Sequence, residues 1–235
     1  MSLTSRTSWL TPRARYIVRM CNLYSLTRSQ DEMRALRRLM RGDRINLPPL
    51  PGIFPDGVAP IVRRADDGEE LVMARWGMPG PPQFGGAPIT NIRNTRSPHW
   101  RAWLAANRCV VPFTSFCEYA DTKPRKTPTW FGLDDSRPLA FFAGIWTEWH
   151  GVRGTKKNPA EGKHLLYGFL TTEANAVVAP IHPKAMPVIL TTVEECDRWL
   201  NATPAEALAL QRPLADDALK IVAQGEREDQ HPLAA

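Results

Sequence analysis

The sequence predicts an α+β fold, a single domain with a largely antiparallel, barrel-like β core and peripheral helices. Strand-sized segments rich in Val, Phe, Trp and Leu occupy the middle of the chain, and the strongest helix-start signals lie toward its ends. The chain has 235 residues, 43% of them hydrophobic, with no internal repeat and no second core, which suits one domain. Many central strands with helices at the ends are typical of an α+β architecture.

The first predicted elements are a helix and a hairpin. Ser29 followed by Glu32 fits a capping box, and apolar residues at helical spacing predict a helix over 30–41. A Pro-rich extended stretch over 44–62 follows, and Asp66-Asp67-Gly68 predicts a turn between strands near 58–64 and 69–76. The Pro- and Gly-rich residues 77–88 indicate a long loop, a type of segment that often carries function.

The later elements are mostly strands. Ser97-Pro98 starts a short helix that carries Trp100 and Trp103. Strands are expected at about 108–112, 115–119, 128–133, 138–148 and 164–171. Two further capping boxes, Thr192 to Glu195 and Thr203 to Glu206, predict that the C-terminal fifth is helical.

Charge is distributed unevenly. The total is +6, made up of +4 in residues 1–19, +7 in 20–189 and −5 in 190–235. A basic body with an acidic tail is compatible either with a solvated surface or with a polyanionic partner. No apolar run reaches the roughly 18 residues of a membrane span, so we expect a soluble protein that does not enter a membrane.

The cysteines and the N-terminus have a bearing on chemistry. Four widely spaced Cys without zinc-ligand spacing or a secretory signal argue against a metal site and against a disulfide scaffold. We expect reduced thiols, a cytoplasmic location and no cofactor, with Cys109 and Cys117 as core residues. We expect residues 1–19 to be a leader or a start assigned too early, because Met20 precedes Cys21. We expect the mature protein to begin at Cys21, with 20–235 as one domain.

Polar residues concentrate in four segments that a plain core would not need. They are Met20-Cys21-Asn22, residues 90–96, residues 115–119 and residues 180–187. From Met20 to about Leu200 the sequence resembles the SOS response-associated peptidase family, with its motifs in consistent order. The motifs that carry the resemblance, besides Met20-Cys21, are Arg75-Trp76-Gly77-Met78-Pro79, Asn91-Ile92-Arg93, Arg108-Cys109-Val110-Val111-Pro112 leading to Glu118, Thr171-Thr172 with Asn175, and His182 before Met186-Pro187.

The resemblance implies a function in the DNA damage response. Members of this family shield abasic sites in single-stranded DNA through a covalent crosslink to an N-terminal Cys, so Cys21 is the implied nucleophile. An N-terminal Cys offers an amine and a thiol on one residue, which can capture an aldehyde as an imine and close it to a thiazolidine. The α-amino pKa near 7.7–8.0 leaves on the order of a tenth of the amine neutral at pH 7.

The resemblance also implies roles for other residues. His182 would assist opening of the sugar ring, Glu118 would shuttle protons, and Asn91 would orient the nucleophile and the sugar. The implied DNA contacts are Arg93 to a phosphate, Trp76 by stacking or wedging, Thr171, and Lys184. Plainer interpretations stay open: a solvent-facing strand residue for Glu118, a loop histidine for His182, a turn former for Asn91, a surface position for Arg93 and a core position for Trp76.

This chain departs from the family pattern at two points. It reads Cys21-Asn22-Leu23 where the family commonly has Cys-Gly-Arg, so an early phosphate-binding Arg is missing. Three residues separate His182 from Met186, where many members have two with an Arg, and Lys184 supplies a charge without a bidentate fork.

Three functions are weighed. The first is covalent capture of abasic single-stranded DNA by a monomer that associates with the nucleoid. The second is a cysteine-type peptidase or autopeptidase, with Cys21 as nucleophile and His182 as base, which could release its own leader. The third is a noncovalent single-stranded-DNA-binding module in which Cys21 is incidental.

Overall fold

The core of the molecule is a closed five-stranded β-barrel. The computed structural model describes residues 22–37, 47–66, 68–84 and 86–229. Around the barrel the strands follow the order β10, β4, β3, β6, β9 and back to β10. All of these pairs are antiparallel except β10 with β4, where Leu166 lies opposite Arg75. The barrel strands are β3 (Val58–Ala65), β4 (Gly68–Trp76), β6 (Arg108–Phe113), β9 (Ala140–Gly154) and β10 (Pro159–Thr172).

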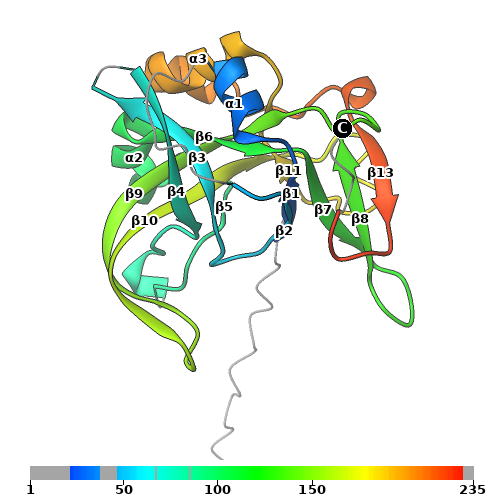
Figure 1. The fold of residues 1–235 in the computed structure, drawn as a ribbon, viewed down its shortest axis with the longest axis horizontal. Helices are drawn as coiled ribbons and strands as arrows, with labels where there is room; N and C mark the ends of the chain where they lie inside the picture. The colour runs from blue at the N-terminus through cyan, green and yellow to red at the C-terminus, as the bar shows by residue number, and fades with distance from the viewer. Residues whose placement is uncertain (1–21, 38–46, 67, 85, 230–235) are drawn as a thin grey trace, which may run out of the picture.

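A second sheet lies beside the barrel (Figure 1). Its strands follow the order β13, β8, β7, β1, β2, and each neighbouring pair is antiparallel. Strand β1 lies between β7 and β2, so the chain just after Asn22 is covered on both edges. The strands are β1 (Tyr24–Leu26), β2 (Leu50–Ile53), β7 (Ser115–Ala120), β8 (Thr127–Gly132) and β13 (Lys220–Gln224).

Aromatic side chains fill the space between the barrel strands and β1. Phe142 stacks on Phe113 with ring centroids 3.8 Å apart, and Phe169 stacks on Trp76 at 5.1 Å. Tyr24 of β1 packs edge-on against Trp76, and its hydroxyl lies 2.5 Å from that of Tyr167. Because aromatic rings bury large areas, this cluster joins the second sheet to the barrel.

Short helices cover the ends of the sheets. They are α1 (Gln30–Arg37), α2 (Arg101–Ala106), α3 (Val193–Asn201) and α4 (Pro204–Leu208), with 3₁₀ turns η1 (Pro82–Phe84), η2 (Pro98–Trp100) and η3 (Asp216–Ala218). Thr203 and Glu206 form the complete capping box predicted for α4. Thr192 caps α3 by accepting a hydrogen bond from the Glu195 amide. Within the described ranges, no helix is long and apolar enough to cross a membrane.

The predicted fold class is confirmed, with some corrections. The C-terminal fifth is not wholly helical, because residues 220–224 form β13 and pair with β8, a strand that lies about 90 residues earlier. Strands β9 and β10 extend beyond the predicted limits as one long hairpin. The short strands β1 and β2 were not predicted. Residues 38–41 of the predicted first helix and the leader 1–19 lie outside the described residues.

Candidate functional site

Glu118 and His182 meet where the second sheet adjoins the barrel. Strand β7 carries Glu118, whose side chain is 5% exposed, and the turn that follows Val178 carries His182. The two side chains approach with 3.8 Å between His182 Nδ1 and Glu118 Oε1. The sequence analysis gave these two residues separate roles and did not pair them, and the fold brings them into contact although they lie 64 residues apart in the chain.

The hydrogen bonds of His182 determine which ring nitrogen is available. Nδ1 lies 2.9 Å from the carbonyl oxygen of Ala185, which can only accept, so Nδ1 carries the proton. In the neutral ring Nε2 is then an acceptor. It is buried and has no hydrogen-bond partner within the described residues. Nε2 of His182 is therefore the ring nitrogen left to accept a hydrogen bond from a ligand.

The start of β1 lies next to Glu118. The backbone amide of Cys117 donates to the Leu23 carbonyl at 2.9 Å, and Tyr24 is the partner of Phe116 across the sheet. Continued by two residues, this antiparallel register brings Asn22 opposite Glu118. Cys21 itself lies outside the described residues, but it is bonded directly to Asn22.

Strand β10 brings two more predicted residues to this region. Asn91 belongs to the short strand β5 (Asn91–Ile92) and pairs with Phe169, while Thr171 pairs with Pro187 of β11 (Met186–Pro187). The two pairing positions on β10 are separated by about 7 Å, two strand residues. Asn91 Nδ2 donates to the Thr90 hydroxyl, which fixes the amide, and both Asn91 and Thr171 are largely buried.

The Arg93 side chain is half-exposed and forms an ion pair with Glu173. Its Nη2 lies 3.1 Å from Glu173 Oε1, and Glu173 also accepts a hydrogen bond from the Thr172 hydroxyl. The Glu173 backbone amide, the Thr172 hydroxyl and Arg93 lower the pKa of the Glu173 carboxyl, in that order. Glu173 therefore already supplies the Arg93 guanidinium with an anionic partner.

Gln211 organises this part of the site and was missed in the sequence. Its Nε2 donates to the carbonyls of Arg93 and Thr171, both at 3.0 Å, and its Oε1 accepts from the Thr95 hydroxyl at 2.8 Å. Gln211 belongs to the acidic C-terminal region, where no candidate was expected. A glutamine more than 100 residues away has no local sequence signal, because only the fold brings it to Arg93.

The described cysteines do not offer a reactive thiolate. Cys109, Cys117 and Cys196 are all buried. Burial raises the pKa of Cys117 to about 12 and that of Cys109 further. A neutral buried thiol is a poor nucleophile. The predicted core position of Cys109 and Cys117 is confirmed, and Cys21 is the remaining cysteine of the sequence.

The stacking role considered for Trp76 is contradicted by its position. The indole is fully buried, stacks on Phe169, and donates from Nε1 to the Thr90 carbonyl at 3.1 Å. It has no exposed face for a base, so the core alternative is correct. Lys184, by contrast, is exposed two residues after His182.

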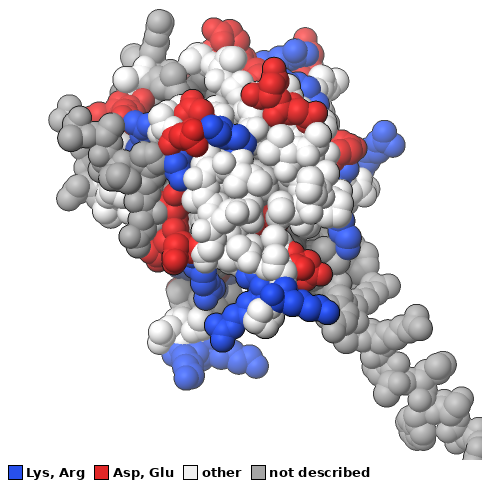
Figure 2. Space-filling model, turned by 90° about the vertical axis from the view of Figure 1, so that its right-hand side faces the viewer, with Lys and Arg blue, Asp and Glu red and all other residues white. Residues whose placement is uncertain are grey.

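Basic side chains gather at one end of the molecule. In the view of Figure 2, Lys and Arg side chains lie along the lower end of the molecule, with most Asp and Glu above them. In Figure 1 the β7–β8 loop and the β9–β10 hairpin both point to this lower end. The exposed cations of the two turns are Lys123, Arg125, Lys126, Lys156 and Lys157. Within the described part of the chain, no cluster of three His, Cys, Asp or Glu side chains could hold a metal ion.

Solved structures share this fold. A protein from Bacteroides thetaiotaomicron superposes with a TM-score of 0.67 at 22% identity, covering 86% of this chain and 90% of that one. A protein from Bordetella bronchiseptica gives a TM-score of 0.67 at 22% identity, covering 87% and 98%.

Sequence comparison gives the family. The abasic site processing protein YoqW of Bacillus subtilis is 33% identical over 156 residues, which cover 61% of this chain and 64% of YoqW. The abasic site processing protein YobE of the same bacterium is 31% identical over 156 residues, 61% of this chain and 66% of YobE. The match therefore spans just under two thirds of these relatives. The profile of the SOS response associated peptidase (SRAP) family matches residues 20–225. The chain belongs to the SOS response associated peptidase family.

Proposed function

We propose that this protein binds abasic sites in single-stranded DNA and crosslinks to them through Cys21. The observation that carries the proposal is the Glu118–His182 pair beside β1, the strand that starts two residues after Asn22. A polar pair placed there serves a reaction at Cys21 better than it serves folding, because burying ionisable groups costs stability. The names of the two Bacillus relatives support the same substrate.

The chemistry requires that Cys21 carry a free α-amino group. The amine adds to the aldehyde carbon of the opened sugar, and loss of water gives an imine. The Cys21 sulfur then adds to the imine carbon, and the thiol proton passes to the nitrogen, which completes a thiazolidine. One water leaves overall and no electrons are exchanged. Residues 1–20 must therefore be absent from the reactive protein.

The site residues divide this work. His182 Nε2, buried and accepting, is positioned to exchange a proton with the sugar as the ring opens. Glu118 takes up and returns protons as water leaves. Asn91 holds the sugar, while Arg93, Lys184 and Thr171 contact the DNA backbone. Arg93 reaches a phosphate only when Glu173 releases it.

A crosslinking gel tests the proposal. Protein that begins at Cys21 is mixed with a single-stranded oligonucleotide carrying one abasic site, and a heat-stable adduct is expected. Cys21→Ala should form none. Cys21→Ser should form only an imine, which borohydride traps. Cys117→Ala is the matched control and should crosslink as wild type does, because the Cys117 thiol is buried.

Other outcomes identify the alternatives. Unchanged DNA binding in Cys21→Ala with no wild-type adduct would indicate a noncovalent binding module. Release of residues 1–20 by the full chain, lost in Cys21→Ala and without any DNA adduct, would indicate a peptidase. Intact mass of protein from its native locus should show Cys21 as the first residue, and retention of Met1 would contradict the mechanism.

A further inference from the structure

A pocket of about 500 Å³ opens on the β2 side of β1. Ile53 lines it and is also the partner of Tyr24, whose other neighbour is Phe116 of β7. Glu118 lies two residues beyond Phe116, so the pocket and the candidate site flank the start of β1 from opposite edges. The backbones of Ile53 and Phe116 are about 10 Å apart, two strand spacings. A ligand that extends beyond the site on this side would meet the pocket next.

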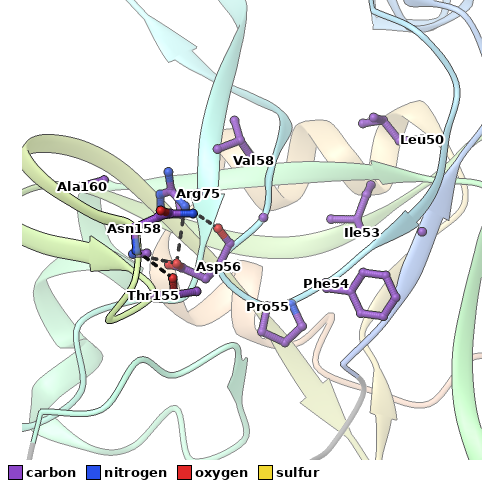
Figure 3. Close-up of a pocket in the computed structure, with 13 residues that line it drawn as sticks. Leu50, Ile53, Phe54, Pro55, Asp56, Val58, Arg75, Thr155, Asn158 and Ala160 are labelled. Atoms are coloured by element: carbon purple, nitrogen blue, oxygen red, sulfur yellow. Dashed lines mark hydrogen bonds and ion pairs between the residues drawn. The ribbon is translucent and has the colours of Figure 1, made fainter.

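The pocket has an apolar wall and a polar wall (Figure 3). Leu50, Ile53, Phe54 and Val58 lie on one side, and the polar side chains lie on the other. The polar wall consists of Asp56, Arg75, Thr155 and Asn158. The volume of the pocket falls within the range of about 300–1,000 Å³ that is typical of small-molecule sites.

The polar wall is held in place by Asp56. This residue has a positive φ of 66°, which few residues other than glycine adopt. Its carboxylate accepts from Arg153 Nε at 3.1 Å and from the Gly154 amide at 2.9 Å, and it pairs with Arg75 at 3.4 Å. These contacts tie the β2–β3 turn to the tip of the β9–β10 hairpin. The two arginines also neutralise the carboxylate, so the wall does not repel an anionic polymer.

The groups left exposed in the pocket suit a flat, polar-edged ring. Phe54 is 37% exposed and Val58 46%, although most apolar side chains of the described residues are buried. Asn158 is exposed, and its hydrogen bonds to Thr155 are made by its backbone, which leaves the side-chain amide to face the pocket. An aromatic ring on one wall and an amide side chain on the facing wall offer a nucleobase a stacking surface and a hydrogen-bonding partner. Lys156 and Lys157, exposed in the same hairpin turn, can contact the adjoining phosphates.

We propose that this pocket binds a nucleobase of the same DNA strand, close to the lesion. The proposal rests on the function proposed above and adds a base-binding subsite to it. Phe54 stacks on the base, and Asn158 contacts its polar edge. Binding then depends on a neighbouring nucleotide that still has its base, although the reacting nucleotide has none.

Base deletion tests the subsite. Oligonucleotides carry one abasic site, and each of the flanking nucleotides is replaced in turn by a baseless spacer. Relative affinity is measured by competition for crosslinking. For wild type, deletion at one position should weaken binding by about 5-fold to 150-fold, the equivalent of about 1–3 kcal/mol for one stacked base. In Phe54→Ala the same deletion should cost less than about twofold. Asn158→Ala should alter which base is preferred at that position.

Val152→Ala is the matched control. Val152 is a 57% exposed apolar residue of the same hairpin that does not line the pocket, so this variant should behave as wild type does. Equal deletion penalties in wild type and Phe54→Ala at every position would overturn the subsite while leaving crosslinking intact.

A second measurement does not depend on the crosslinking chemistry. Undamaged single-stranded oligonucleotides containing 5-iododeoxyuridine are irradiated with the protein, and the adducts are located by peptide mass spectrometry. An adduct at Phe54 supports the subsite even if no abasic adduct forms and the proposed function fails. Photoadducts confined to other segments, as expected if the pocket takes a peptide or a second copy of the chain, would overturn it.

Discussion

Replacing Gln211 with Ala should destabilise the protein and weaken its hold on DNA. The side chain makes three hydrogen bonds, one from Thr95 and one each to the carbonyls of Arg93 and Thr171. At about 0.5–1.5 kcal/mol each, their loss should lower the free energy of unfolding by about 1.5–4.5 kcal/mol. Because typical domains are stable by only about 5–15 kcal/mol, this effect is large.

The assay is urea unfolding followed by tryptophan fluorescence, paired with single-stranded DNA affinity. Gln224→Ala is the matched control, since this exposed glutamine of β13 should change stability by less than about 0.5 kcal/mol. Gln211→Glu isolates the effect of the two donated hydrogen bonds. The new carboxylate can still accept from the Thr95 hydroxyl, but it cannot donate to the carbonyls of Arg93 and Thr171. Once protonated it can donate, so its deficit relative to wild type should be smaller at pH 5 than at pH 8. A loss below 0.5 kcal/mol in Gln211→Ala, or a pH-independent deficit in Gln211→Glu, would refute the reasoning.

Two further predictions concern charge and protonation. Glu173→Gln removes the carboxylate that is paired with Arg93, and it should raise affinity for single-stranded DNA a few-fold at low salt in fluorescence anisotropy. Asp217→Asn makes the same charge change in the acidic tail and should not raise the affinity, so equal effects of the two variants would show that only net charge matters. Burial raises the pKa of Cys117 from 9.0 to about 12, so above pH 9 the folded protein keeps a proton that the unfolded chain releases. The free energy of unfolding should therefore fall as pH rises above 9, by about 1.4 kcal/mol per pH unit for this thiol. Cys117→Ala should make urea midpoints between pH 8 and 10.5 less steep in pH, and rapid alkylation of Cys117 in the folded protein at pH 8 would contradict its burial.

The sequence alone determined the local elements of the fold. The capping box at Thr203 and the β3–β4 hairpin form as predicted because their signals lie within a few residues of each other. The α+β class followed in the same way, from the apolar pattern of the central strands. Strand β13 was missed because it is short, mostly exposed, and formed only by pairing with β8.

The tertiary structure decided which polar residues come together. Glu118 and His182 were identified through a family resemblance, but their 3.8 Å approach depends on how β7 and the turn before β11 are packed. Trp76 stands at the end of a strand before a long loop, a place compatible with either core or contact, and only the packing of Phe169 against it decides for the core. Gln211 reaches Arg93 across 118 residues, and the pocket beside β1 joins two turns about 100 residues apart. Local propensity acts between residues that lie close together in the sequence. Contacts such as these depend instead on how the strands are ordered in the barrel and the sheet, so only the tertiary structure could reveal them.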